Sequence, residues 1–316
     1  MSDVLFIKTS SLGDVVHHMP ALTEARARRP DAHFRWVVEE AFAPLVALHP
    51  AVDTVIPVAA RRWRKTLFAP ATWSEVMRFR RTLAERRYDA IIDTQGLLKS
   101  ALLARFAHGP RHGYDAHSIK ESLASRFYDV RHAVDWNAHA IARNRVLTGL
   151  ALGYRPDGAP DYGLDRAKIA APGDAPYAVL LHATAWSEKQ WPLEHWRTLA
   201  ASLGERIDIV LPWGTESERG AAMRIASATA RAEVPERRPL DGVARLIAGA
   251  SFVVGVDTGL LHLAAALGVP LVAIFTGSDP VLTGPMGSGP MAVVGRRGSA
   301  PSLAEVSEAI RAVAAG

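Results

Sequence analysis

The chain has 316 residues, of which 49% are hydrophobic and 22% are charged, and it contains no cysteine. This length exceeds the usual size of one hydrophobic core and predicts two domains of roughly 150 residues each. The missing cysteines exclude disulfides, thiol catalysis and cysteine-ligated metals. Asp3 stands where a signal peptide would carry positive charge, and no apolar run reaches the roughly 18 to 20 residues of a membrane span, so we expect a cytoplasmic protein.

Charge is divided unevenly along the chain. Residues 1–154 hold 22 Lys and Arg against 15 Asp and Glu, a net charge of +7, whereas the remainder holds 15 against 17, a net charge of −2. The basic first half favours an anionic partner, and an ordinary solvated basic surface is the alternative.

In both halves, apolar segments rich in strand-forming residues alternate with segments that have the apolar periodicity of a helix. This alternation predicts α/β domains with parallel sheets covered by helices. The first half predicts strands over 4–8, 34–40, 53–58 and 89–95, and helices over 15–29, 41–48, 71–87, 97–107 and 139–154. Residues 155–176 are rich in Pro and Gly and predict an inter-domain linker. The second half predicts strands over 177–184, 208–213, 252–257 and 271–277, and helices over 193–204, 216–230, 240–250, 259–268 and 302–314. Two doubly wound domains joined in this way imply a cleft between them.

The segment "TSSLGD" follows the first predicted strand, where an α/β domain carries its binding loop. Gly13 permits close backbone approach of a ligand. Asp14 stands at a helix start, so its spacing fits an N-cap as well as a catalytic carboxylate. Both interpretations stay open at this level.

A basic run, "RRWRK", follows the third strand. Its Arg side chains suit bidentate binding of carboxylate or phosphate. A nucleic-acid patch and a solvated turn are the alternatives, although no recognition-helix motif accompanies the run.

Two loops of the second half predict a diphosphate site. "HATAWSEKQWP" contains Lys189, and "VGVDTGLLHLAAALGVP" runs from a strand through Asp257, Thr258 and Gly259 into a helix that carries His262. A helix N-terminus with a hydroxyl and a glycine is well suited to bind phosphate. The chain has no Asp-x-Asp, zinc-protease or G-x-S-x-G motif, and it lacks the G-x-G-x-x-G fingerprint that an oxidoreductase or epimerase would carry.

The segments "KTSSLGDVVH", "RWVVEE", "VIPVAARRWRK", "DTQGLLKSALLARFAHG", "LPWG" and "VDTGLLHLAAALGVP" together resemble glycosyltransferase family 9, the ADP-heptose:lipopolysaccharide heptosyltransferases, over nearly the whole chain. The segments RRWRK and KTSSLGD point to the type I branch of the family. The resemblance implies a GT-B fold, in which two Rossmann-like domains face each other across a cleft. Residues 1–154 would bind the acceptor and residues 177–316 the donor. The C-terminal helix 302–314 could pack back on the first domain.

The resemblance also implies the reaction. The donor would be ADP-L-glycero-β-D-manno-heptose, and the acceptor a 3-deoxy-D-manno-octulosonic acid (Kdo) residue of Kdo2-lipid A. Transfer would be inverting and would need neither a cofactor nor a metal. The protein would meet the cytoplasmic face of the bacterial inner membrane peripherally and would bind no nucleic acid. The alternatives are a type II heptosyltransferase, a nucleotide-dependent oxidoreductase or epimerase, and a basic binding protein without activity.

The family pattern, carried over residue by residue, makes Asp14 the catalytic base. It assigns donor binding to Thr184, Lys189, Glu218, Asp257, Thr258, Gly259 and His262. It assigns acceptor binding to Ser10, Ser11, Gly13, Arg61, Arg62, Arg64, Lys65 and Lys120. Two positions depart from the pattern: Ala185 stands where a second Thr is expected, and Lys120 stands where relatives carry Arg. Because base and donor motif lie on different domains, we expect the domains to close about the linker.

Overall fold

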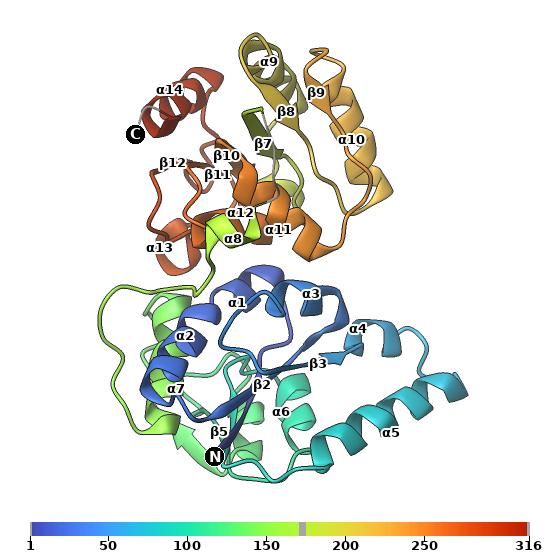
Figure 1. Cartoon of the computed structure of the whole chain (residues 1–316), viewed down its shortest axis with the longest axis vertical. Coiled ribbons are helices and arrows are strands. Elements are labelled where there is room, and N and C mark those ends of the chain that lie inside the picture. The colour runs from blue at the N-terminus through green and yellow to red at the C-terminus, as the bar shows by residue number, and fades with distance from the viewer. Residues whose placement is uncertain (1, 171–174, 315–316) are drawn as a thin grey trace. The chain divides into compact units, whose positions relative to one another are not determined.

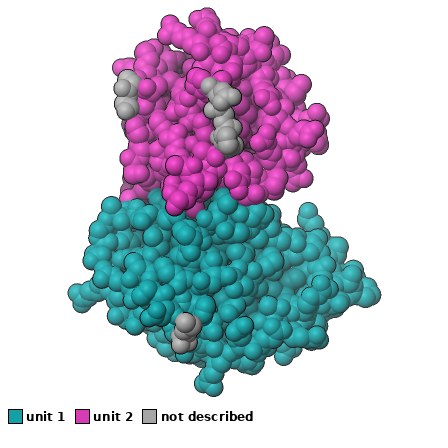
Figure 2. All heavy atoms as spheres, viewed as in Figure 1, with its two compact units in different colours: residues 1–163 teal, residues 164–316 magenta. Residues whose placement is uncertain are grey.

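The structure is a computed structural model, and it describes residues 2–170 and 175–314. It divides into two compact units, residues 1–163 and 164–316, which are coloured separately in Figure 2. The division falls inside the predicted linker 155–176, of which residues 171–174 lie outside the described part. This segment also contains a short helix, α8 (Arg166–Ile169), which was not predicted.

Unit 1 contains a six-stranded sheet in which every pairing is parallel (Figure 1). The strand order is β3-β2-β1-β4-β5-β6, so the order reverses between β1 and β4. In doubly wound sheets, ligands bind at the carboxyl ends of the strands beside such a reversal. The strands are β1 (Asp3–Ile7), β2 (His33–Glu39), β3 (Thr54–Val58), β4 (Ala90–Asp93), β5 (Arg111–Tyr114) and β6 (Val130–His132).

The predicted helix 15–29 is wrong as one element, because the chain forms two helices there. The first ends before His17, and the second begins with Pro20 in its first turn, where a missing N–H costs no hydrogen bond. The α-helices of unit 1 are α1 (Leu12–Val16), α2 (Met19–Arg28), α3 (Ala43–Val46), α4 (Ala60–Trp63), α5 (Pro70–Ala84), α6 (Leu98–Ala104) and α7 (Ala140–Leu152), with 3-10 turns η1 (Glu40–Phe42) and η2 (Ser122–Phe127).

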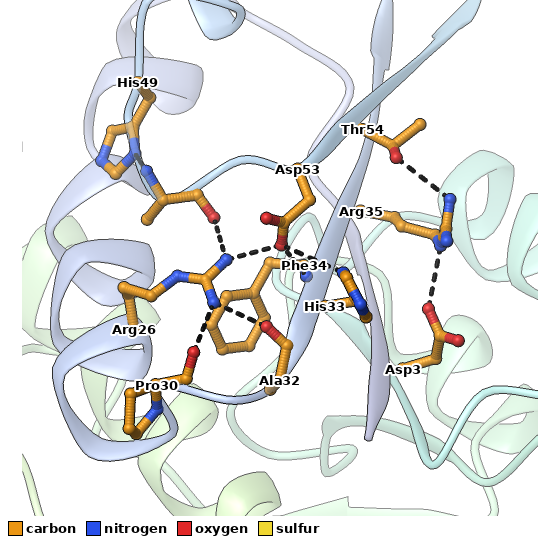
Figure 3. A network of polar contacts seen from close by, with 11 residues as sticks. Asp3, Arg26, Pro30, Ala32, His33, Phe34, Arg35, His49, Asp53 and Thr54 are labelled. Atoms are coloured by element: carbon orange, nitrogen blue, oxygen red, sulfur yellow. Dashed lines mark hydrogen bonds and ion pairs between the residues drawn. The ribbon is translucent and has the colours of Figure 1, made fainter. Parts of the chain in front are cut away.

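A polar network braces the amino-end edge of this sheet (Figure 3). The guanidinium of Arg26, on α2, donates to the carbonyls of Pro30 and Ala32 and to Asp53 Oδ2. The same oxygen of Asp53 accepts from the backbone N–H of Phe34 at 2.7 Å. These bonds fasten the end of α2 to the starts of β2 and β3, so this edge is structural and the carboxyl edge is left for binding.

Unit 2 repeats the topology with the order β12-β11-β10-β7-β8-β9, again all parallel, and the order reverses between β7 and β10. Its strands are β7 (Tyr177–Leu181), β8 (Asp208–Val210), β9 (Ala232–Glu233), β10 (Phe252–Val256), β11 (Leu271–Phe275) and β12 (Met291–Gly295). Besides α8, its helices are α9 (Leu193–Leu203), α10 (Glu216–Ala226), α11 (Leu240–Gly249), α12 (Gly259–Ala266), α13 (Pro280–Thr283) and α14 (Leu303–Ala314), with the 3-10 turn η3 (Ser187–Lys189).

The C-terminal helix α14 buries its apolar face within unit 2. Val306, Ile310 and Val313 join the core that contains Trp196 and Phe252. The expected option that this helix also packs back on the first domain stays a prediction. None of the helices in residues 2–170 and 175–314 combines the length and hydropathy needed to cross a membrane.

Candidate functional site

The loop after β1 is fixed by one side chain from the loop that follows β4 and one from α6. Gln95 Oε1 accepts from the backbone N–H groups of Thr9 and Ser10, both at 3.0 Å. Lys99 Nζ donates to Ser10 Oγ at 3.1 Å, so this predicted acceptor hydroxyl lies buried against a cation. Sequence analysis did not single out Gln95 or Lys99, although both lie in the segment "DTQGLLKSALLARFAHG".

Asp14 lies at the third position of α1 and is half-buried. The N-cap of this helix is Ser11, so the alternative interpretation that Asp14 is itself the N-cap is wrong. Asp14 Oδ2 instead accepts from the Ser11 N–H at 2.7 Å and from Ser11 Oγ at 3.1 Å, which is the third-position half of a capping box. These bonds fix the carboxylate at the carboxyl edge of the sheet, and Gly13 precedes it within the same helix.

A buried lysine lies near this carboxylate. Lys8 directly follows β1 and donates from Nζ to the Thr94 carbonyl at 2.8 Å. Burial lowers the pKa of Lys8, while the charges of Asp14 and Asp93 oppose that shift. Lys120, exposed on the segment after β5, acts on Lys8 as a like charge and lowers the same pKa. Sequence analysis missed Lys8, although a lysine closing an apolar strand was a visible signal.

The basic run begins at the same edge. The Glu39 N–H donates to the Thr9 carbonyl at 3.2 Å, and Glu39 Oε1 accepts from the Arg61 N–H at 3.0 Å, which connects α4 to the loop after β1. Arg62 is engaged in ion pairs with Glu40 at 3.1 Å and Glu75 at 2.8 Å. Arg62 differs in these ion pairs from Arg61, Arg64 and Lys65, and the assignment of all four residues to acceptor binding stays a prediction.

The strand-to-helix turn of unit 2 is organised around Asp257. Lys189 Nζ lies 2.6 Å from Asp257 Oδ2, and Ser278 Oγ donates to the same oxygen. His262 Nε2 lies 3.7 Å from Asp257 Oδ1. Burial by itself would raise the pKa of Asp257, but the hydrogen bonds from His262, Lys189 and Ser278 outweigh it and leave this pKa well below its usual value. Asp257 is therefore an anion that positions Lys189.

The flanking backbone completes this turn. Thr258 is the N-cap of α12, its side chain makes no capping bond, and Gly259 is the first residue of the helix. Thr184 Oγ1 donates to the Asp257 carbonyl at 3.2 Å, so the loop after β7 is joined to the end of β10. Ser278 was not predicted from the sequence, although it lies in the loop that follows the strand "LVAIF".

A cavity of about 430 Å³ lies beside this turn, and Thr184 forms part of its wall. Glu218 lies in the same wall, and its Oε2 accepts from the N–H groups of Gly214 at 2.7 Å and Thr215 at 3.0 Å. Trp191 and Trp196 line the cavity and meet edge to face at 5.1 Å. The volume falls in the range of small-ligand sites, and a purine nucleoside would match its aromatic and polar lining. In the part of the chain that the structure describes, no three His, Asp or Glu side chains form a metal-binding group.

The chain matches the family model of glycosyltransferase family 9 (heptosyltransferase) over residues 76–310. It is 50% identical to lipopolysaccharide heptosyltransferase 1 of Pseudomonas aeruginosa, over 90% of this chain and 81% of that protein. It is 47% identical to the Escherichia coli K12 protein of the same name, over 91% of this chain and 92% of that protein. The structure superposes on the E. coli heptosyltransferase WaaC solved with ADP, with a TM-score of 0.92 and 45% identity over 98% and 99% of the two chains. This chain therefore belongs to glycosyltransferase family 9, the heptosyltransferase family.

Proposed function

We propose that this protein transfers L-glycero-D-manno-heptose from ADP-heptose to a Kdo residue of lipid A, as a type I heptosyltransferase. The observation that carries the proposal is the Lys189–Asp257 pair at the N-terminus of α12, beside a cavity of nucleoside size. The solved E. coli relatives, at 45% identity, are described with ADP and with ADP-2-deoxy-2-fluoro heptose. Type I is favoured over type II because the type 1 proteins of P. aeruginosa and E. coli are 50% and 47% identical to this chain, whereas the E. coli type 2 protein is 26% identical.

The donor would bind across the turn and the cavity of unit 2. Glu218 keeps Oε1 for the ribose hydroxyls, since the capping bonds use Oε2. The diphosphate would meet Lys189, the Thr258 hydroxyl and the N–H groups that begin α12. As ADP departs, these groups would stabilise the negative charge that grows on its diphosphate.

Asp14 would act as the base in a single in-line displacement. A Kdo hydroxyl attacks the anomeric carbon of the heptose, the bond from that carbon to the diphosphate oxygen breaks, and ADP leaves with inversion. Asp14 takes the hydroxyl proton, a contribution typically worth 10² to 10⁴ in rate. Arg61, Arg64, Lys65 and Lys120 would bind the carboxylate and phosphate groups of the acceptor. Because Lys189 and the N-terminus of α12 can stabilise the leaving diphosphate, we propose that the reaction needs no metal. We also propose that it takes place at the cytoplasmic face of the inner membrane.

The test is transfer of heptose from ADP-heptose to two acceptors, Kdo2-lipid A and Kdo2-lipid A that already carries one heptose. We expect product with the first and little with the second. A preference for the heptosylated acceptor would establish the type II reaction instead. Absence of transfer to either acceptor, with ADP bound normally, would contradict the proposal.

A further inference from the structure

The segment from α4 to α5 forms an ordered projection at the side of unit 1 (Figure 1). Its base is Trp63, which is buried, packs on Phe79 and donates from Nε1 to Glu75 Oε2 at 2.7 Å. The turn between the helices is closed by a 2.8 Å bond between the hydroxyls of Thr66 and Thr72. The backbone of the projection is therefore held in place without any partner.

This projection turns large apolar side chains outward. Phe68 is fully exposed, and Leu67, Trp73 and Met77 are 51%, 59% and 49% exposed. Trp73 Nε1 donates to the Leu67 carbonyl at 2.9 Å, so the indole is fixed against the turn. Such a concentration of exposed apolar side chains within eleven residues marks an interaction surface.

Cations flank the apolar side chains on both sides. Residues 60–84 contain seven Lys and Arg and one acid, Glu75, which is already paired with Arg62. Arg64 and Lys65 precede the turn, whereas Arg78, Arg80 and Arg81 follow it on α5, and all five are exposed. Trp73, Met77 and Arg80 are spaced three to four residues apart, so they share one face of α5.

We propose that this projection docks on the surface of an anionic phospholipid bilayer. Phe68, Leu67 and Trp73 would enter the headgroup region, where aromatic side chains are favoured, and the flanking cations would lie against lipid phosphates. The combination of a protruding Phe and Trp with several cations fits this partner, because bilayer binding draws on both apolar insertion and attraction to anionic lipid. A nucleic acid would use the cations but would leave Phe68 and Leu67 without a role.

The inference goes beyond the proposed function, since it assigns the surface by which the chain would meet a membrane. It is tested with the full chain and vesicles that contain no acceptor. Sedimentation should show binding to vesicles of equal parts phosphatidylcholine and phosphatidylglycerol, and weak binding to phosphatidylcholine alone. Raising salt from about 0.1 M to about 1 M shortens the Debye length from about 10 Å to about 3 Å and should release most of the protein.

The decisive variant is Phe68→Asp, which should weaken vesicle binding at least tenfold, because it removes an inserted ring and adds a charge of the wrong sign. Phe68 is fully exposed, so the variant should fold like the parent chain. Met223→Asp is the matched control, a 54% exposed apolar residue on α10 of unit 2, and it should bind like the parent. Equal binding of Phe68→Asp and the parent, or binding to oligonucleotide in preference to vesicles, would overturn the inference. Vesicle binding without heptose transfer would contradict the proposed function alone.

Discussion

Substitution of Lys189 by Met tests the donor site most directly. The change keeps the length of the side chain and removes its charge. Lys189 is 23% exposed, and its ammonium lies 2.6 Å from Asp257, so the variant loses an ion pair as well as the proposed phosphate contact. Two quantities should therefore change, the affinity for ADP and the stability of unit 2.

The affinity change follows from the proposed bond. A hydrogen bond between charged groups contributes about 1.5 to 3 kcal/mol, which corresponds to roughly a 10- to 150-fold change in Kd. Lys189 must divide its three donors between Asp257 and the diphosphate, so we expect the lower end, about tenfold weaker ADP binding. Asp257 would keep Ser278 and His262 as partners, so we expect a stability loss of about 2 kcal/mol and a fall in Tm of about 4 to 8 °C.

Calorimetric titration with ADP and thermal unfolding measure the two quantities separately. Lys189→Arg keeps the charge and should restore most of the affinity. Lys168→Met is the matched control, since Lys168 is 83% exposed and pairs with Asp165 three residues earlier. A folded Lys189→Met variant that binds ADP as tightly as the parent would refute the assignment of Lys189 to the diphosphate.

Three further changes probe other parts of the two units. Asp14→Asn should lower kcat by about 10² to 10⁴ and leave ADP binding unchanged. The variant should keep the bond from Ser11, because the Asn oxygen can still accept it. A near-parental kcat in steady-state assays would show that Asp14 is not the base. Glu218→Gln should keep Tm, since the amide oxygen can still cap α10, and should weaken ADP binding about tenfold in titrations; unchanged binding would contradict the ribose contact. Burial lowers the pKa of His49 to about 4, and its Nδ1 accepts from the Ala51 N–H at 3.1 Å. Folding therefore disfavours protonated His49, so about 3 kcal/mol of stability present above pH 6.5 should be lost as the pH falls to about 4. His49→Gln should flatten that part of the Tm-against-pH curve, and an unchanged slope would contradict the assignment.

The central strands could be predicted from the sequence because both faces of each are covered. β1, β7, β10 and β11 carry the continuous apolar runs expected of buried parallel strands. The strands β5, β6, β9 and β12 were missed, and they lie at or next to the ends of their sheets. β5 reads "RHGY" and β6 "VRH", and no residue of β12 is fully buried. Such strands are defined by pairing with a neighbour, which local patterns do not contain.

The residues of the candidate site likewise fall into those that could be predicted from the sequence and those that could not. The positions of Asp14, Lys189 and Asp257 could be predicted because each lies on the segment that follows a strand in sequence. The groups that orient the loops come from adjacent strands and helices: Gln95 binds the loop after β1, and Ser278 binds Asp257. Finding such partners requires the order of strands in each sheet, which the sequence leaves implicit. The strand order of each sheet supplies this step, because it brings β4 beside β1 and β11 beside β10.

Asp14 shows how a structural role and a chemical role can belong to one carboxylate. The capping bonds from Ser11 both reach one oxygen of Asp14, Oδ2. The proton of the acceptor hydroxyl would be received by the other oxygen, Oδ1. Those bonds also limit rotation of the Asp14 side chain. A base needs such a fixed orientation if its oxygen is to meet a hydroxyl at hydrogen-bond distance. Helix capping and catalysis by Asp14 are therefore compatible.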